Sequence, residues 1–330
     1  MVVGLLHYLA THISATPTYL QYVLWPTFWA LQGGVGTGLW VIAHECGHRA
    51  FSDSVLVCDV VGWILHSLLL VPYHSWRISH AKHHRSTGDL KRDEVFLPRT
   101  VSSLKDQKAV AYQAPGPLGL VKIVAETIGM FLVGWYLYLG FHMAGRDYGK
   151  TTNHYDPRSP LFNAGQFWMV VISDIGVLAV LAGAAGVAWH SGWWTVAAYF
   201  AIPLMVTNFW LLLYTFLHHT DPALPHYRTE EWNWLQGALA TVDRDYGVFF
   251  NTMHHDIGST HVLHHLFSMI PHYHAKEASE AIKPVLGKYY YQNPQGIAQS
   301  LWEVITTCRY VDDLTTERAV WFTGKGAKSM

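Results

Sequence analysis

The sequence predicts an all-α membrane protein, a transmembrane helical bundle that carries a histidine-rich cap on its cytosolic side. Of the 330 residues, 51% are hydrophobic and only 14% are Asp, Glu, Lys or Arg, whereas an ordinary soluble domain has about 25% charged residues. The 22 histidines equal the lysines and arginines combined. A net charge of -1 gives no electrostatic reason to expect nucleic acid as a partner.

The N-terminal region predicts the first membrane span. The first 43 residues contain no charged side chain apart from histidine, and residues 22–43 form an apolar run. A helix that crosses a bilayer needs about 20 such residues. Residues 1–13 are also apolar and are predicted to be membrane-associated. Because the chain begins inside this apolar region, we expect its N-terminus to be incomplete.

Two further spans are predicted at about 167–189 and 193–217. No charged residue occurs from Ile175 to Thr220, and the stretch HSGWW at 190–194 divides this region. The pattern predicts a helical hairpin with a very short outer loop.

Two other apolar runs, 55–73 and 119–142, are ambiguous. The first contains Asp59, and the second contains Lys122 and Glu126. Each is interpreted as a membrane-associated segment, either re-entrant or lying in the interface. If the histidine motifs meet on one side of the membrane, neither run can be a lone full crossing.

The distribution of basic residues predicts the orientation. Lysines and arginines concentrate between the first span and the 119–142 run, whereas the loop at 190–192 has none. By the positive-inside rule, the histidine-bearing side faces the cytosol. We therefore expect one domain over residues 1–330, with a cytosolic cap made of 74–118 and 218–330.

Three histidine motifs point to a metal site. HECGH at 44–48 places two histidines one helical turn apart, as in zinc peptidases. HAKHH at 80–84 and HVLHH at 261–265 share the pattern H-x-x-H-H, which puts three imidazoles on one helix face. Zinc sites use at most four protein ligands, so this many histidines favours a dinuclear, redox-active centre of iron and dioxygen. The predicted ligands are His44, His48, His80, His83, His84, His261, His264 and His265.

These motifs resemble the three histidine boxes of membrane-bound fatty acid desaturases. The likeness lies in HECGH, in HSWRISHAKHHRSTG (74–88) and in HVLHHLFS (261–268). The surrounding stretches, such as RDEVFLP and HHTDPALPHY, are similar to those of the Δ12 (omega-6) oleate desaturases of plants and fungi. Glu45 agrees with the Δ12 type, because omega-3 relatives more often carry Asp there.

The resemblance implies a site of two non-haem iron ions held by the eight box histidines. It adds His219, in FLHHTDP, as a further ligand, with His218 and His255 as weaker candidates. Glu45 is expected to accept a hydrogen bond from a ligating imidazole. Trp63, Trp76, Trp210 and Tyr214 could line an apolar acyl tunnel, and core packing or a place in an interfacial aromatic belt is an equal alternative for them.

The implied reaction is O2-dependent insertion of a cis double bond at C12–C13 of an oleoyl chain, which gives linoleoyl. The sequence has no H-P-G-G haem motif, so we expect electrons to come from separate cytochrome b5 and NADH-cytochrome b5 reductase. The resemblance implies the endoplasmic reticulum membrane. It leaves open whether phospholipid or coenzyme A carries the acyl chain, and it leaves the oligomeric state open.

Several alternatives remain at this point. An omega-3 desaturase, a hydroxylase, an epoxygenase or an acetylenase could use the same boxes. An HExxH zinc metallopeptidase would explain HECGH but would leave the other six clustered histidines without a role. A non-catalytic membrane metal carrier or sensor is the third class.

Overall fold

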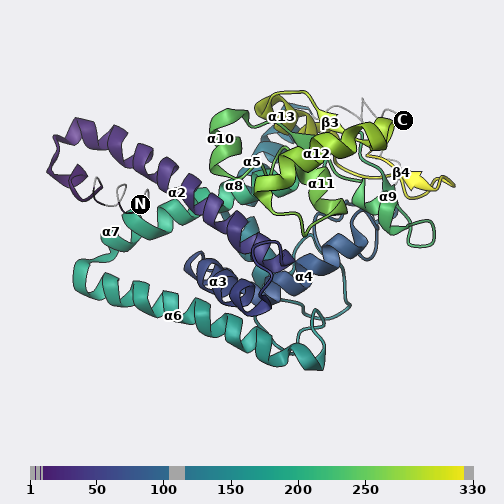
Figure 1. Ribbon diagram of the computed structural model, residues 1–330. Coiled ribbons are helices and arrows are strands. Elements are labelled where there is room, and N and C mark those ends of the chain that lie inside the picture. Colours follow the sequence, from purple (N-terminus) through teal and green to yellow (C-terminus); the bar gives the residue numbers. More distant parts are fainter. Residues whose placement is uncertain (1–3, 5–7, 9, 104–115, 323–330) are drawn as a thin grey trace.

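The computed structural model describes residues 4, 8, 10–103 and 116–322, and helices form most of this part of the chain (Figure 1). This confirms the all-α prediction. The main helices are α2 (Thr18–His48), α3 (Val55–Leu68), α4 (Tyr73–Ser86), α5 (Pro117–Phe141), α6 (Phe167–Ser191), α7 (Trp193–Val196), α8 (Ile202–His219), α9 (Trp234–Ala238), α10 (Gly247–Met253), α11 (His261–Leu266), α12 (His272–Leu286) and α13 (Ile297–Thr307). Shorter turns are η1 (Ile13–Ala15), η2 (Val101–Ser103), η4 (Ala164–Gln166), the π-helix η5 (Ala197–Ala201) and η6 (Gly287–Tyr289).

Short strands tie the C-terminal region together. β1 (His226–Tyr227) pairs antiparallel with β4 (Ala319–Val320), and His226 lies opposite Val320. β2 (Asp243–Arg244) pairs parallel with β3 (Gln292–Asn293). Each strand has two residues, so these pairs act as clips between loops and do not form an extended sheet.

Within the described residues, three helices are long and apolar enough to cross a membrane. They are Pro117–Phe141, Ala164–Ser191 and Trp193–His219. The last two coincide with the predicted hairpin, whose outer turn is Gly192. α2 covers the predicted span 22–43 but is not among the three, because glycines and polar residues dilute its apolar run. Its crossing of the membrane stays a prediction. Most of residues 1–13 lie outside the described part of the chain.

The two ambiguous runs adopt different structures. Residues 55–73 form α3 and then turn into α4, with an angle of 105° between the two helices. Pro72 stands directly before α4, and Leu70 has a φ of 55°. Proline disfavours helical backbone in the residue before it, which explains a break at this point. The 119–142 run is the unbroken helix α5, which ends at Phe141 and is followed by His142 with a φ of 52°.

Glycines set the position of α2 against its neighbours. A Cβ at Gly33 would overlap Val206 of α8, and one at Gly36 would overlap the Thr207 hydroxyl. Thr207 Oγ1 also donates to Gly33 O at 3.0 Å. Small residues allow such close approach of helices in membranes. The contact fixes the axis of α2, whose last turn carries His44 and His48.

A buried apolar cluster lies directly beside the histidine motifs. It includes Trp40 from α2, Trp76 from α4, Trp135 from α5 and Leu211 from α8. These helices are distant in sequence, so the cluster is what gathers the histidine-bearing helix ends into one place.

Candidate metal centre

The histidines of the three motifs converge from α2, α4 and α11, and the end of α8 adds one more. They form two sets, which we call group 1 and group 2. Group 1 consists of His44, His48, His80, His84 and His264, and group 2 of His83, His219 and His265. Within each group, one potential ligand atom per residue lies within 4.8 Å of the others. His261 adjoins group 2, with its Nε2 at 3.1 Å from the Nε2 atoms of His219 and His265.

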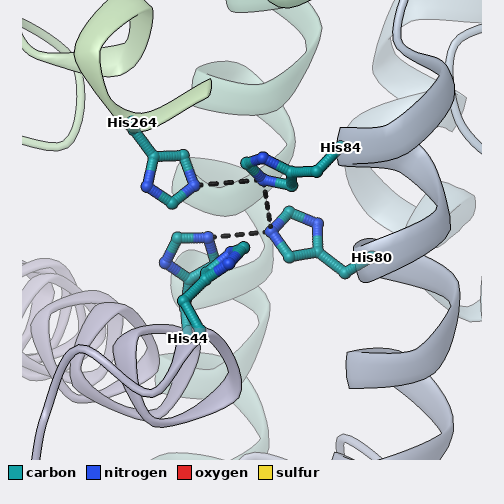
Figure 2. A group of neighbouring side chains, drawn as sticks. His44, His80, His84 and His264 are labelled. Atoms are coloured by element: carbon teal, nitrogen blue, oxygen red, sulfur yellow. Dashed lines mark hydrogen bonds between the residues drawn. The ribbon is translucent and has the colours of Figure 1, made fainter. Parts of the chain in front are cut away.

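Four of the five group 1 rings, those of His44, His80, His84 and His264, form a row in which neighbouring Nε2 atoms face one another (Figure 2). The distance is 2.9 Å from His44 to His80, 3.1 Å from His80 to His84, and 3.2 Å from His84 to His264. For two nitrogens bound at right angles to one metal at about 2.1 Å, the expected separation is about 3.0 Å. The spacing of these nitrogens therefore fits the edges of a coordination polyhedron.

Hydrogen bonding alone does not satisfy this row of contacts. Each Nε2 carries at most one hydrogen, and a nitrogen that carries one cannot accept another. Along a row of four nitrogens, at most two of the three contacts can then be hydrogen bonds. At least one close N···N contact is therefore left without a hydrogen bond, and a cation bound between the rings would satisfy the nitrogens that remain. The row from His83 through His219 and His261 to His265 has the same pattern, at 3.2, 3.1 and 3.1 Å.

Burial favours the neutral form of the third-motif imidazoles, which is the form in which histidine binds a metal. It lowers the pKa of His261, His264 and His265 well below the ordinary value, and neighbouring imidazoles lower each pKa further. The lone pairs therefore stay available at physiological pH.

Asp93 orients a ring of group 2. His83 Nδ1 donates to Asp93 Oδ1 at 2.6 Å, which leaves His83 Nε2 to face His219. The carboxylate is held in turn by the backbone N–H groups of Gly88 and Glu94, at 2.9 and 2.7 Å. A carboxylate behind a ligating histidine fixes the tautomer and raises the basicity of the ligand. Sequence reasoning missed Asp93, which lies in the loop of RDEVFLP without helical spacing to His83.

Asp243 supports the third motif. Its Oδ1 accepts from Val262 N in the first turn of α11 at 2.8 Å, and its Oδ2 accepts from Tyr290 Oη at 2.6 Å. Burial raises the pKa of this carboxyl to about 6. The contact fixes the start of the helix that carries His261, His264 and His265.

The expected role of Glu45 requires a correction. It accepts no hydrogen bond from a box histidine. Its Oε1 accepts from His272 N at 2.5 Å and its Oε2 from His272 Nδ1 at 2.6 Å. Successive residues on a helix are about 100° apart, so Glu45 faces α12 when His44 faces the metal groups. A carboxylate engaged in this way is not free to act as the base of a zinc peptidase.

The two weaker ligand candidates lie outside both groups. The His255 ring is 4.5 Å from the ring of His272, on the Glu45 side of α2. The His218 ring stacks on His261 with a centroid distance of 3.9 Å. His219, the stronger candidate of the FLHHTDP stretch, belongs to group 2.

An apolar cavity of about 630 Å³ opens onto both groups. His44 and His80 of group 1 and His83 and His219 of group 2 line it, together with His261. The other walls are largely apolar and include Trp40, Trp135, Met130, Leu211 and Ile257. This volume lies in the range of about 300–1,000 Å³ that is typical of small-molecule sites. The cavity can thus hold an apolar ligand against the histidine nitrogens.

Of the four aromatic candidates for the tunnel, two line the cavity and two make other contacts. Trp76 and Tyr214 line the cavity. Trp63 instead donates from Nε1 to Ile172 O of α6 at 2.8 Å. Trp210 packs against Phe250 with a centroid distance of 4.4 Å.

Fold and site together define a membrane protein whose clustered histidines form two groups that could hold metal ions, beside an apolar cavity. The family model "Fatty acid desaturase" matches residues 22–294, and the chain belongs to this family.

Similar curated proteins carry more specific names. A "Delta(12)-oleate desaturase" of Trichosanthes kirilowii is 46% identical, over 98% of this chain and 87% of that protein. A "Delta(12) fatty acid desaturase" of Mortierella isabellina is 46% identical, over 89% of this chain and 76% of that protein. An "Omega-6 fatty acid desaturase, endoplasmic reticulum isozyme 2" of Glycine max is 47% identical, over 97% of this chain and 83% of that protein.

Proposed function

We propose that the protein is a Δ12 fatty acid desaturase that inserts a cis double bond at C12–C13 of an oleoyl chain and yields linoleoyl. The observation that carries the proposal is the apolar cavity, which opens onto both histidine groups at once. An acyl chain in this cavity would place its methylenes beside the ligand nitrogens. Further support comes from the names of the similar proteins of plants and fungi.

We assign one iron ion to group 1 and a second to group 2 with His261. The donors fit iron because they are imidazoles whose nitrogens converge at the separation expected of ligands that share a metal. The bound iron ions would supply the O2-dependent oxidation that removes hydrogen from an unactivated methylene. No side chain in a protein is a strong enough base to remove a proton from such a C–H bond.

The chain's own residues bind the acyl chain, position it and exclude water. Reactive geometry requires the reacting atoms to come within about 3–3.5 Å, so the cavity walls select the carbon that is attacked. Trp76 stacks on His80 with a centroid distance of 4.5 Å, and Trp40 stacks on His44 at 5.5 Å. These indoles form part of the cavity wall and also restrain the ligand rings.

The cellular setting is part of the proposal. Separate cytochrome b5 and NADH-cytochrome b5 reductase would deliver electrons on the cytosolic side, where the basic residues concentrate. Residence in the endoplasmic reticulum is supported by the Glycine max relative, whose name places that protein there.

Expression in yeast that makes no linoleate tests the proposed activity. Gas chromatography of fatty acid methyl esters should show a new diene with double bonds at carbons 9 and 12. His84→Ala, which removes a group 1 nitrogen, should abolish the diene. An unchanged profile from membrane-inserted wild-type protein would refute the proposal, and a triene, hydroxy, epoxy or acetylenic product would replace it with one of the alternatives named above.

A further inference from the structure

Glu45 and His272 join the helix of the first histidine motif to the helix that follows the third. Both oxygens of the Glu45 carboxylate are engaged, one by the backbone N–H and one by the ring Nδ1–H of His272. The Glu45 side chain is 9% exposed and that of His272 is 27% exposed. A partly buried, two-point, charge-assisted contact has a defined direction and is stronger than a neutral hydrogen bond.

The helix that receives this contact has few other anchors. Along α12, only Ala275 and Ser279 are buried. Tyr273, next to His272, is 69% exposed. The position of the first turn of α12 on the protein therefore depends strongly on its contact with Glu45.

The two histidine groups depend differently on α2. Group 1 takes His44 and His48 from α2 and His264 from α11, whereas no residue of group 2 lies on α2. α11 ends at Leu266, and α12 begins six residues later at His272. The contact of Glu45 with His272 thus links α2 to the short segment that follows α11. Both α2 and α11 contribute histidines to group 1.

We propose that His272, through Glu45, is a positioning residue that holds α2 and the segment after α11 at the separation required for a metal ion in group 1. Group 2 depends on α4, α8 and α11, and Asp93 supports its His83 through hydrogen bonds that involve neither α2 nor α12. Loss of the His272 side chain should therefore weaken one metal site and spare the other. The inference rests on the two-metal centre proposed above.

The test is the iron content of full-length protein, purified from membranes in detergent and loaded with ferrous iron. Wild type should hold two iron ions per chain, and His272→Ala should hold one. Residues behind metal ligands commonly change metal affinity by roughly 10- to 100-fold, so titration of the variant should show one unchanged site and one weakened to this degree. Glu45→Gln should give the same pattern, because its amide can no longer accept at both positions.

Two variants serve as matched controls. His272→Asn places an amide N–H close to the position of the imidazole Nδ1–H and should restore the second iron. His274→Ala removes a histidine from the same turn, where it is 61% exposed and lies 3.7 Å from the Glu277 carboxylate. It should leave both sites unchanged.

The outcomes separate this inference from the proposed function. Two irons in His272→Ala, loss of both, or an equal loss in His274→Ala would overturn the positioning role. Failure of both His272→Ala and Glu45→Gln to fold, with His274→Ala folded, would also overturn it, because the contact would then serve stability as a whole. If wild type itself binds fewer than two metal ions, the proposed centre fails.

Discussion

At the scale of single residues, side chains that hydrogen-bond to the histidine motifs fix the orientation of the rings and the position of their helices. Asp93 fixes His83, Asp243 fixes the start of α11, and Glu45 reaches His272. The histidine spacing identified the candidate ligands. Among the supporting acids, Asp93 was not predicted, because a loop brings it to His83 without helical spacing. Glu45 was even assigned to the wrong partner, since its neighbours in sequence lie on another face of the helix.

Replacing Asp93 tests this support at group 2. Asp93→Asn keeps the shape but removes the charge that fixes the His83 Nδ1–H. We expect roughly 10- to 100-fold weaker iron binding at one site and a smaller diene yield in yeast. Metal titration of the purified variant measures the first effect. Binding equal to that of wild type at both sites would show that Asp93 has no influence on the metal.

The lowered pKa values of the ligand histidines predict a pH dependence for the metal-free protein. Unfolded histidine titrates near about 6.5, whereas His261, His264 and His265 titrate well below this when folded. As the pH falls below about 6.5, the unfolded chain takes up protons that the folded chain does not, so stability declines. Melting temperatures of metal-free protein should therefore fall from pH 7 to pH 5. A constant or rising melting temperature over this interval would contradict neutral, buried rings.

At the scale of secondary structure, glycine contacts place α2 and therefore His44 and His48. The apolar runs predicted the long helices α2, α6 and α8, and the lack of charge from Ile175 to Thr220 predicted the hairpin. The bend between α3 and α4 and the unbroken course of α5 were left open, because periodicity alone does not tell whether an apolar run crosses, turns back or lies in an interface.

Enlarging a glycine at the α2–α8 contact should displace the first histidine motif. A Cβ in Gly36→Ala would overlap the Thr207 hydroxyl, which is buried in α8. We expect a lower melting temperature and reduced iron content. Gly183→Ala is the matched control, since a Cβ there meets no atom within 4 Å and alanine favours helix by up to about 1 kcal/mol. Equal behaviour of the two variants would refute a role for this contact.

At the scale of the whole molecule, a helical membrane bundle and a C-terminal cap meet at the histidines. Buried Arg244 helps to join them, because its guanidinium donates to Leu217 O at the end of α8, to Asp221 and to Ser300 of α13. This arrangement lets the cavity run from the apolar helices to the ligand nitrogens. The sequence motifs indicated that such a centre exists. Its division into two groups could be seen only once α2, α4, α8 and α11 were placed together.

The most direct test of a two-iron centre is the metal content of wild-type protein, purified from membranes without added metal and measured together with its protein concentration. We expect iron in a ratio of two ions per chain, with little zinc. Removal of the iron with a chelator should abolish desaturation, and ferrous iron should restore it. One zinc ion per chain, with activity that persists without iron, would contradict the assignment of both histidine groups.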